Sequence, residues 1–265
     1  MTRPGKYREP EVETGIGVFV TDLGHVYPGG TVALRDVSFE VGAGEFVTLV
    51  GPSGCGKSTI LRLMTGLESP TSGQICGPDG SSLKDTSIVF QHATLLPWRK
   101  VLSNVELPLE LKMGSQLSKL ERSAIARNCL QLVGLADSAD RLPRQLSGGM
   151  QMRVSIARAL VVKPPLLLMD EPFGALDDMT RQSLQLELLR IWRDQGCTIV
   201  FVTHNVTEAV LLSDRVVVMK SDPGRIAEIC DIPLPRPRSD ETRDTPEFVA
   251  LVADVRAALQ QAHYA

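Results

Sequence analysis

Apolar residues gather in short continuous runs that alternate with segments of helical period along most of the chain. The runs cover residues 46–50, 87–90, 166–170, 198–202 and 215–220. Such runs are typical of strands that are buried on both faces, as in a parallel sheet. Helical patterns over residues 58–67 and 180–192 separate several of them. The sequence therefore predicts an α/β fold with a mainly parallel central sheet.

Three other regions depart from this alternation. Residues 18–23 and 31–41 are β-branched segments on either side of Pro28-Gly-Gly30, which predicts an N-terminal antiparallel β subdomain. No strand-like run occurs between residues 90 and 166, and residues 118–132 have a helical period, so we expect a helical insert over about 92–164. An amphipathic helix is expected near the C-terminus, within residues 241–265, and packed on the domain.

Composition and charge exclude several classes of protein. The 265 residues allow one or two domains, and the net charge of −3 gives no reason to expect a nucleic-acid partner. The five cysteines are widely spaced without a C-x-x-C pair, which points to neither disulfides nor zinc and favours a reducing cytosol. Residues 1–15 are charged and rich in proline, so we expect a disordered tail rather than a signal peptide. No run is long enough to predict a membrane-spanning helix.

A glycine-rich segment follows the apolar run 46–50. It matches G-x-x-x-x-G-K-[ST] and lies between a predicted strand and a predicted helix. Glycines allow successive backbone N–H groups to turn toward a phosphate, and the positive end of the next helix favours the anion. Lys57 is expected to reach the β- and γ-phosphates of a nucleotide, and Ser58 to bind Mg²⁺. The predicted nucleotide-binding residues here are Gly51, Pro52, Ser53, Gly54, Cys55, Gly56, Lys57, Ser58 and Thr59.

Two adjacent carboxylates end the apolar run 166–170. Asp170 is expected to hold the Mg²⁺ shell, and Glu171 to orient and polarise a water for attack on the γ-phosphate. Neighbouring side chains of a strand point apart, but a turn at Pro172 would let both carboxylates face one cleft. The pair therefore predicts a nucleotide-hydrolysing site beside the phosphate loop.

A second glycine-rich helix start lies inside the predicted helical insert. Leu146-Ser-Gly-Gly-Met150 precedes a segment of helical period, and such a helix N-terminus suits an anion. This segment resembles the signature motif of the ATP-binding cassette (ABC) ATPases. The resemblance extends over residues 27–204, and the remaining motifs of the family follow in its order: Tyr27, Gln91, Asp170-Glu171, Ala175-Leu-Asp177 and His204.

The resemblance implies a P-loop ABC ATPase domain over residues 16–240, with ATP and Mg²⁺ as its ligands, and a role for each matching residue. Tyr27 would stack on adenine, although by itself it is equally consistent with a packing aromatic. Gln91 would bind Mg²⁺ and sense the γ-phosphate, and His204 would contact the γ-phosphate at the transition state. With Glu171, these two side chains make up the implied catalytic set.

The resemblance also implies a two-fold homodimer. Ser147, Gly148 and Gly149 of one chain would cover the ATP on the phosphate loop of the other, in a head-to-tail arrangement. Met150 and Asn205 depart from the Gln and Asp that the family often has at these positions. Neither departure replaces a group assigned to phosphate or metal.

The segment after Gln91 resembles a narrower group. His92-Ala-Thr-Leu-Leu-Pro-Trp-Arg99 contains the Leu-Leu-Pro-Trp-Arg stretch of the nitrate, sulfonate, taurine and bicarbonate importer ATPases. The resemblance implies the ATP-hydrolysing subunit of a bacterial importer, peripheral on the cytoplasmic face of the inner membrane. Its partners would be permease subunits and, indirectly, a solute-binding protein. Leu95, Leu96 and Trp98 are candidate permease contacts, and packing against the helical insert is the alternative.

Two other functions fit the sequence less well. A soluble ABC ATPase that acts on ribosomes or DNA, or a regulatory subunit, usually has paired cassettes or a long coiled-coil insertion, and this chain has one cassette. A P-loop GTPase or small-molecule kinase would leave residues 146–149 without a role, and the Asn-Lys-x-Asp sequence that binds guanine is absent.

Overall fold

The computed structural model describes residues 15–83, 85–114 and 116–264, so the expected tail over 1–15 lies, except for Gly15, outside the described residues. The strands are β1 (Val18–Val26), β2 (Val32–Val41), β3 (Phe46–Val50), β4 (Ser72–Cys76), β5 (Ser87–Val89), β6 (Leu166–Asp170), β7 (Thr198–Thr203), β8 (Arg215–Lys220) and β9 (Arg225–Asp231). The α-helices are α1 (Lys57–Met64), α2 (Val101–Met113), α3 (Lys119–Leu132), α4 (Gly148–Leu160), α5 (Asp178–Gln195), α6 (Val206–Leu212) and α7 (Pro246–Tyr264).

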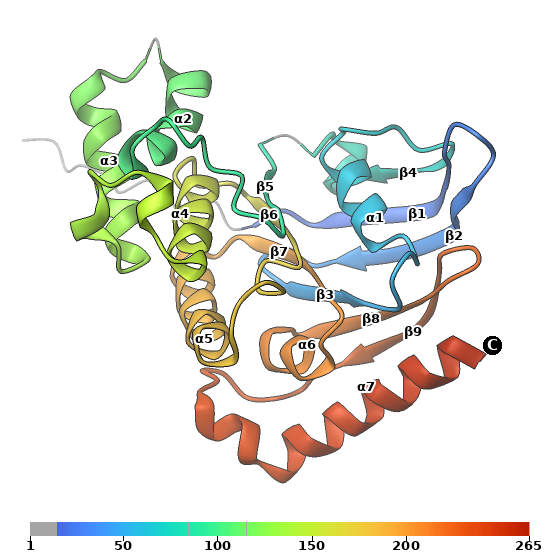
Figure 1. Cartoon of the computed structure of the whole chain (residues 1–265). Helices are drawn as coiled ribbons and strands as arrows, with labels where there is room; N and C mark the ends of the chain where they lie inside the picture. Colours follow the sequence, from blue (N-terminus) through green and yellow to red (C-terminus); the bar gives the residue numbers. More distant parts are fainter. Residues whose placement is uncertain (1–14, 84, 115, 265) are drawn as a thin grey trace, which may run out of the picture.

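The strands form two sheets (Figure 1). The larger sheet has the order β5-β6-β7-β3-β8-β9, in which all neighbours are parallel except β9, which runs antiparallel to β8. The smaller sheet is antiparallel, with the order β2-β1-β4. The predicted fold class, a mainly parallel sheet with an antiparallel β subdomain and a helical insert, is confirmed.

The register of the parallel sheet brings three strand ends to one level. Val50 of β3 pairs with Thr203 of β7, and Val202 of β7 pairs with Asp170 of β6. The residues that follow these ends, starting at Gly51, Glu171 and His204, therefore emerge side by side. Open α/β sheets bind their ligands at this edge.

Burial of both faces explains the continuous apolar runs. In β6, Leu166 and Leu168 pack in the cluster that includes α1 and the smaller sheet, and Leu167 and Met169 pack in the cluster that includes α4 and α5. The strand is thus apolar from Leu166 to Met169 because neither of its faces meets solvent there. None of the helices that the described residues form is both long and apolar enough to cross a bilayer.

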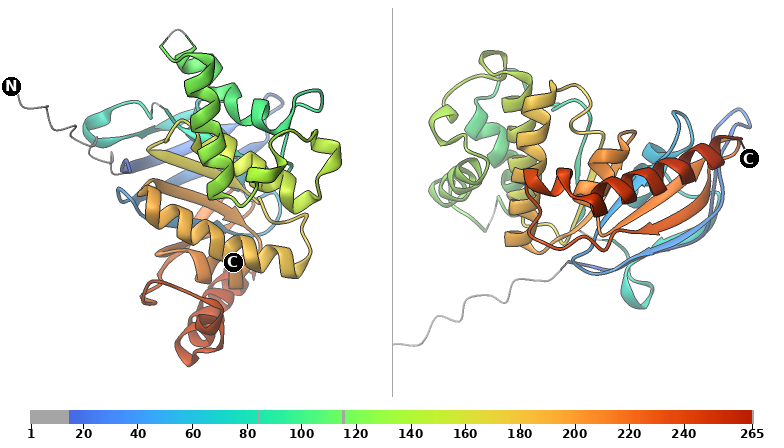
Figure 2. Two further views of the ribbon diagram at one scale, coloured as in Figure 1. Left: turned by 90° about the vertical axis from the view of Figure 1, so that its left-hand side faces the viewer. Right: turned by 90° about the horizontal axis from the view of Figure 1, so that it is seen from below.

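The helices beside the sheet include some that the sequence pattern did not predict. α2, α3 and α4 pack together at one end of the large sheet, on the other side of the molecule from β1, β2 and β4 (Figures 1 and 2).

The pattern missed α2, because Pro108 interrupts it, and also β4 and β9. Burial in these strands is low, with no fully buried position in either. They therefore have no apolar run to detect.

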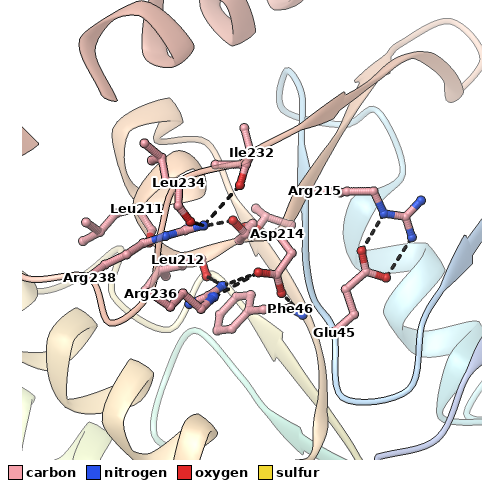
Figure 3. Close-up of polar contacts among 12 residues, drawn as sticks. Glu45, Phe46, Leu211, Leu212, Asp214, Arg215, Ile232, Leu234, Arg236 and Arg238 are labelled. Carbon is pink, nitrogen blue, oxygen red and sulfur yellow. Dashed lines mark hydrogen bonds and ion pairs between the residues drawn. The ribbon is translucent and has the colours of Figure 1, made fainter. Parts of the chain in front are cut away.

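The C-terminal part of the chain covers α6 and β8. α7 packs along α6, β8 and β9 (Figure 2). Two arginines of the segment before α7 contact the C-terminus of α6. Nη1 of Arg238 donates to the carbonyls of Val210, Leu211 and Ser213, and Nη2 of Arg236 donates to the carbonyl of Leu212 (Figure 3). The last carbonyls of a helix lack partners within it, so the two arginines satisfy the C-terminus of α6.

We expect Arg238→Met to lower the free energy of unfolding by about 2–4 kcal/mol, because the buried carbonyls lose their donor. Arg238 is only 6% exposed, so water cannot replace the guanidinium without rearrangement. Urea denaturation measures the change, with Arg127→Met on the exposed surface of α3 as the matched control. An equal effect of the two variants would contradict this role of Arg238.

Candidate functional site

The phosphate loop joins the end of β3 to the start of α1. Its glycines Gly54 and Gly56 have φ values of 81° and 95°, a backbone region that favours glycine. A Cβ on Gly56 would lie 2.4 Å from a methyl carbon of Leu34, so the loop also needs the space. The amino group of Lys57 is turned back onto the loop, where it donates to the carbonyls of Gly51 at 2.8 Å and Pro52 at 2.9 Å. The loop is thus closed around its own lysine.

Cys55 lies beneath this loop. The side chain is fully buried, and burial raises the pKa of the thiol. A Cβ on Gly51 would lie 2.7 Å from its sulfur, so this side chain fills the space under the turn. Cys55 therefore supports the loop from inside, and only its backbone is available to a ligand.

Ser58 and Asp170 meet across the sheet edge. The Ser58 hydroxyl donates to Oδ1 of Asp170 at 2.9 Å, although 112 residues separate the two in sequence. Burial raises the pKa of Asp170, and the hydrogen bond from Ser58 partly opposes that shift. The two predicted magnesium ligands are therefore adjacent, and burial outweighs the opposing effects of Ser58, Arg62 and Lys57 on the carboxylate.

Glu171 turns the chain at the end of β6. Its φ is 45°, and its N–H donates to the carbonyl of Val202 at 2.9 Å. The expected turn at Pro172 is present, closed by the hydrogen bond from the N–H of Gly174 to the carbonyl of Glu171 at 3.1 Å, and the left-handed backbone at Glu171 begins it. Oε2 of Glu171 accepts a hydrogen bond from Nδ1 of His204 at 2.9 Å. The glutamate and the histidine from two adjacent strand ends thus form a pair.

Gln91 reaches the same place from the segment after β5. A Cβ built on Gly174 would lie 3.4 Å from Nε2 of Gln91 and 3.6 Å from Oε2 of Glu171. Both side chains therefore converge on Gly174, and a larger residue there would crowd them. The structure brings Gln91, Glu171 and His204 together as the sequence predicted.

A cavity of about 430 Å³ opens over the phosphate loop. Its lining residues are Tyr27, Thr31, Val32, Ala33, Ser53, Gly54, Gly56, Lys57, Ser58, Thr59, Glu171, Asp222 and Gly224. The volume lies in the range of small-molecule sites. The phosphate loop forms part of its wall, and Tyr27 forms another part.

Tyr27 is anchored at this cavity by two contacts. Its hydroxyl lies 2.9 Å from Oγ1 of Thr59, and its ring meets the imidazole of His25 edge to face at 4.8 Å. His25 is buried and its other contacts are the carbonyl of Ser69 and the carboxylate of Glu68. Sequence reasoning missed His25, and only its position two residues before Tyr27 could have drawn attention to it.

The signature segment lies outside this cavity. Ser147 is the N-cap of α4, where its hydroxyl accepts from the N–H of Met150, and Ser147 and Gly148 are exposed. Neither these two residues nor Gly149 is among the residues that line the cavity. A Cβ on Gly149 would lie 2.5 Å from a methyl carbon of Thr180, so this helix start packs closely on α5. The exposed helix N-terminus therefore takes no part in the wall of its own chain's cavity.

The segment after Gln91 is held from inside and exposed at its tip. The buried Asn104 accepts from the N–H of Leu96 at 2.8 Å and donates to its carbonyl at 3.2 Å. Leu95 packs against the core, whereas Trp98 is 74% exposed. Leu95 therefore packs internally, which was the alternative to a permease contact, whereas the side chain of Trp98 is accessible to a partner.

Arg158 ties this segment to the signature helix. From α4, its guanidinium donates to the carbonyls of Ala93 at 3.0 Å and Thr94 at 2.9 Å. Thr94 has a positive φ of 43°, which directs its carbonyl to the arginine side of the turn. Sequence reasoning missed both Arg158 and Asn104, which act on backbone groups that no sequence motif displays.

Comparison with known proteins gives one family and many relatives. The family model described as "ABC transporter" matches residues 34–174. The bicarbonate transport ATP-binding protein CmpD of Synechocystis sp. is 43% identical over 88% of this chain and 85% of its own length. The nitrate import ATP-binding protein NrtC of Synechococcus elongatus is 46% identical over 88% of this chain and 36% of its own length.

A solved structure supports the same relationship. It is a dimeric ATP-binding cassette in a post-hydrolysis state bound to ADP and Pi. The identity is 35% and the TM-score 0.72, and the match covers 81% of this chain and 98% of that chain. Most of this chain therefore has the fold of a cassette that binds ADP and phosphate.

We expect Asp170→Asn to raise the free energy of unfolding of the nucleotide-free protein at pH 7. The pKa of Asp170 is higher in the folded protein, so the folded state binds its proton more tightly than the unfolded chain does. Stability from this group is present below the usual carboxyl pKa and lost as the pH rises through the raised value. Urea denaturation at pH 7 and pH 5 should show a gain that shrinks at the lower pH. A less stable Asp170→Asn at pH 7 would contradict this interpretation.

Proposed function

This chain belongs to the ABC transporter family, and we propose that it is the ATP-hydrolysing subunit of an importer for a small anion. It is an ATPase that binds ATP, as its family and its nucleotide-bound structural relative establish. The observation that supports the placement of the reaction is the convergence of Ser58, Asp170, Glu171 and His204 beside the phosphate loop.

Lys57 and the loop N–H groups would bind the phosphates. In the nucleotide-free protein, carbonyls of Gly51 and Pro52 satisfy the Lys57 ammonium group. A phosphate oxygen carries more negative charge than a carbonyl, so ATP displaces these contacts and the amino group turns outward. The two carbonyls therefore give the buried ammonium group of Lys57 hydrogen-bond partners until a nucleotide binds.

The residues near the phosphates fit Mg²⁺. The hydroxyl of Ser58, the carboxylate of Asp170 and the amide oxygen of Gln91 are the hard oxygen ligands that this ion prefers. The raised pKa of Asp170 marks a buried carboxylate whose ionised form a cation would stabilise. When bound, Mg²⁺ supplies neutralisation of the charge on the β- and γ-phosphate oxygens.

Glu171 and His204 would act on the attacking water and the γ-phosphate. The carboxylate of Glu171 accepts a proton from the water and orients its lone pair toward phosphorus. Nδ1 of His204 donates to that carboxylate, which fixes the ring, and the ring would contact a γ-phosphate oxygen. The 2.9 Å contact thus holds the two groups in one orientation before ATP binds.

The position of the signature segment supports a dimer in which the sites are shared. Ser147 and Gly148 are exposed and lie outside their own chain's cavity, so a second chain is the source of a signature segment at each nucleotide. The dimeric state of the solved relative supports the same arrangement. Each ATP would then lie between the phosphate loop of one chain and the helix N-terminus of the other.

The relatives support an importer and leave the solute to its other subunits. The printed names of two relatives with similar identity, 43% and 46%, give bicarbonate and nitrate. A cassette of this kind therefore serves more than one small anion, and the permease and the solute-binding protein would select it. Trp98, exposed beside the two leucines, is the proposed permease contact that would hold the subunit at the cytoplasmic face of the inner membrane.

Glu171→Gln should bind ATP with Mg²⁺ nearly as wild type but hydrolyse it at least about 100-fold more slowly. The amide keeps the shape of the side chain but is a poor acceptor for the proton of water. ATP binding is measured by titration, hydrolysis by phosphate release, and association by sedimentation, where the variant should accumulate an ATP-bound dimer. Hydrolysis within about twofold of wild type would refute the role of Glu171.

Trp98→Ala should uncouple the subunit from its membrane partner. Phosphate release by the purified subunit should stay within about twofold of wild type, because Trp98 is not among the residues that line the nucleotide cavity. Anion uptake by cells, and recovery of the subunit with the membrane fraction, should both fall by about tenfold or more because the anchor side chain is lost. Leu120→Ala, on the exposed surface of α3, is the matched control. Unchanged uptake would exclude Trp98 as a contact.

A further inference from the structure

One buried carboxyl near the site has no role in the proposed reaction. Glu208 of α6 is 4% exposed, and Gln185 of α5, its neighbour, is 2% exposed. Nε2 of Gln185 donates to Oε1 of Glu208 at 2.7 Å. Burial raises the pKa of Glu208, while hydrogen bonds from Thr203 and Gln185 oppose that shift. Two fully enclosed polar side chains in a core require a structural or functional reason.

The contact continues to the C-terminal segment. Nη2 of Arg243, in the 3₁₀ helix Asp240–Asp244 before α7, donates to Oε1 of Gln185 at 2.6 Å. A guanidinium only donates, so it fixes the Gln185 carbonyl toward Arg243 and the amide toward Glu208. The three side chains therefore form a chain of hydrogen bonds with one direction, from the segment after β9 to α6.

The far end of this chain reaches the catalytic pair. Glu208, His204 and Glu171 line one small cavity, which Arg181 also lines. The N–H of Glu208 donates to Oδ1 of Asn205, and the N–H of Asn205 donates to Oγ1 of Thr203. His204 thus stands between two residues that are tied to the first turn of α6. Its own ring is 66% exposed, so the contact with Glu171 and the backbone on either side of His204 are what hold it.

We propose that Arg243, Gln185 and Glu208 are positioning residues that hold the start of α6, and with it His204, in the orientation that meets Glu171. The inference rests on the proposed roles of His204 and Glu171. It makes the segment 240–244 part of the hydrolytic machinery, although this segment lies outside the cavity over the phosphate loop. The chain acts on orientation alone, and nucleotide binding at Lys57 and Tyr27 does not involve it.

The test compares kcat with KM for ATP in Gln185→Met, which keeps the volume and removes both hydrogen bonds. We expect kcat to fall by about tenfold or more, since small displacements of a catalytic group are costly, and KM to stay within about twofold. Gln182→Met, the same change at an exposed position of α5, should leave both constants unchanged. Equal kcat values for folded Gln185→Met and wild type would overturn the proposal.

A second pair of variants keeps the test decisive if Gln185→Met fails to fold. Arg243→Met should lower kcat in the same way, and Arg243→Lys, which retains a donor, should recover most of it. Loss of kcat in both, or in neither, would overturn the directional chain. Glu171→Gln and His204→Ala serve as references measured in parallel. If they lose hydrolysis while Gln185→Met and Arg243→Met do not, only the positioning inference is wrong. If they retain it, the proposed roles of the pair and this inference both fail.

Discussion

The level register of β3, β7 and β6 is the constraint on which the site depends. Val50 opposite Thr203, and Val202 opposite Asp170, place the phosphate loop, His204 and Glu171 at one edge. These strands are buried on both faces, so a shift by one residue would move every side chain of a strand into the core cluster on the opposite face and disrupt packing in both clusters. Packing far from the nucleotide therefore fixes the spacing of the catalytic groups, and the site needs few contacts of its own.

Charge at the nucleotide-free site is balanced locally. Lys57 is held by carbonyls and Asp170 by a serine hydroxyl, and neither contact is an ion pair. Because these partners are neutral, a phosphate oxygen can replace the carbonyls at Lys57, and a cation can replace the hydroxyl at Asp170. The site is consequently organised before ligand binding, and the binding of phosphate and cation removes an electrostatic penalty rather than a set of salt bridges.

The sequence was sufficient for features that leave a local pattern and insufficient for those that do not. Apolar runs predicted β3, β6, β7 and β8, and glycine spacing placed the phosphate loop between β3 and α1. β4 and β9 have no buried stripe, and α2 contains Pro108, so pattern alone missed them. Of the side chains near the site, Asp170 and Glu171 were found because they end a strand. Arg158 and Gln185 were missed because each contacts a residue more than 20 positions away in sequence. His25 was missed because its ring meets Tyr27 only in the folded strand.

The hydrogen bonds of Arg158 have a further consequence for how two chains of a dimer would change conformation together. They join α4, whose N-terminus is exposed, to Ala93 and Thr94, which lie between Gln91 and Trp98. A displacement of α4 by a second chain's nucleotide would pull on this segment through the two hydrogen bonds of the arginine. The proposed permease contact of one chain would then respond to the nucleotide bound at the other chain, and the two halves of an importer would change conformation together.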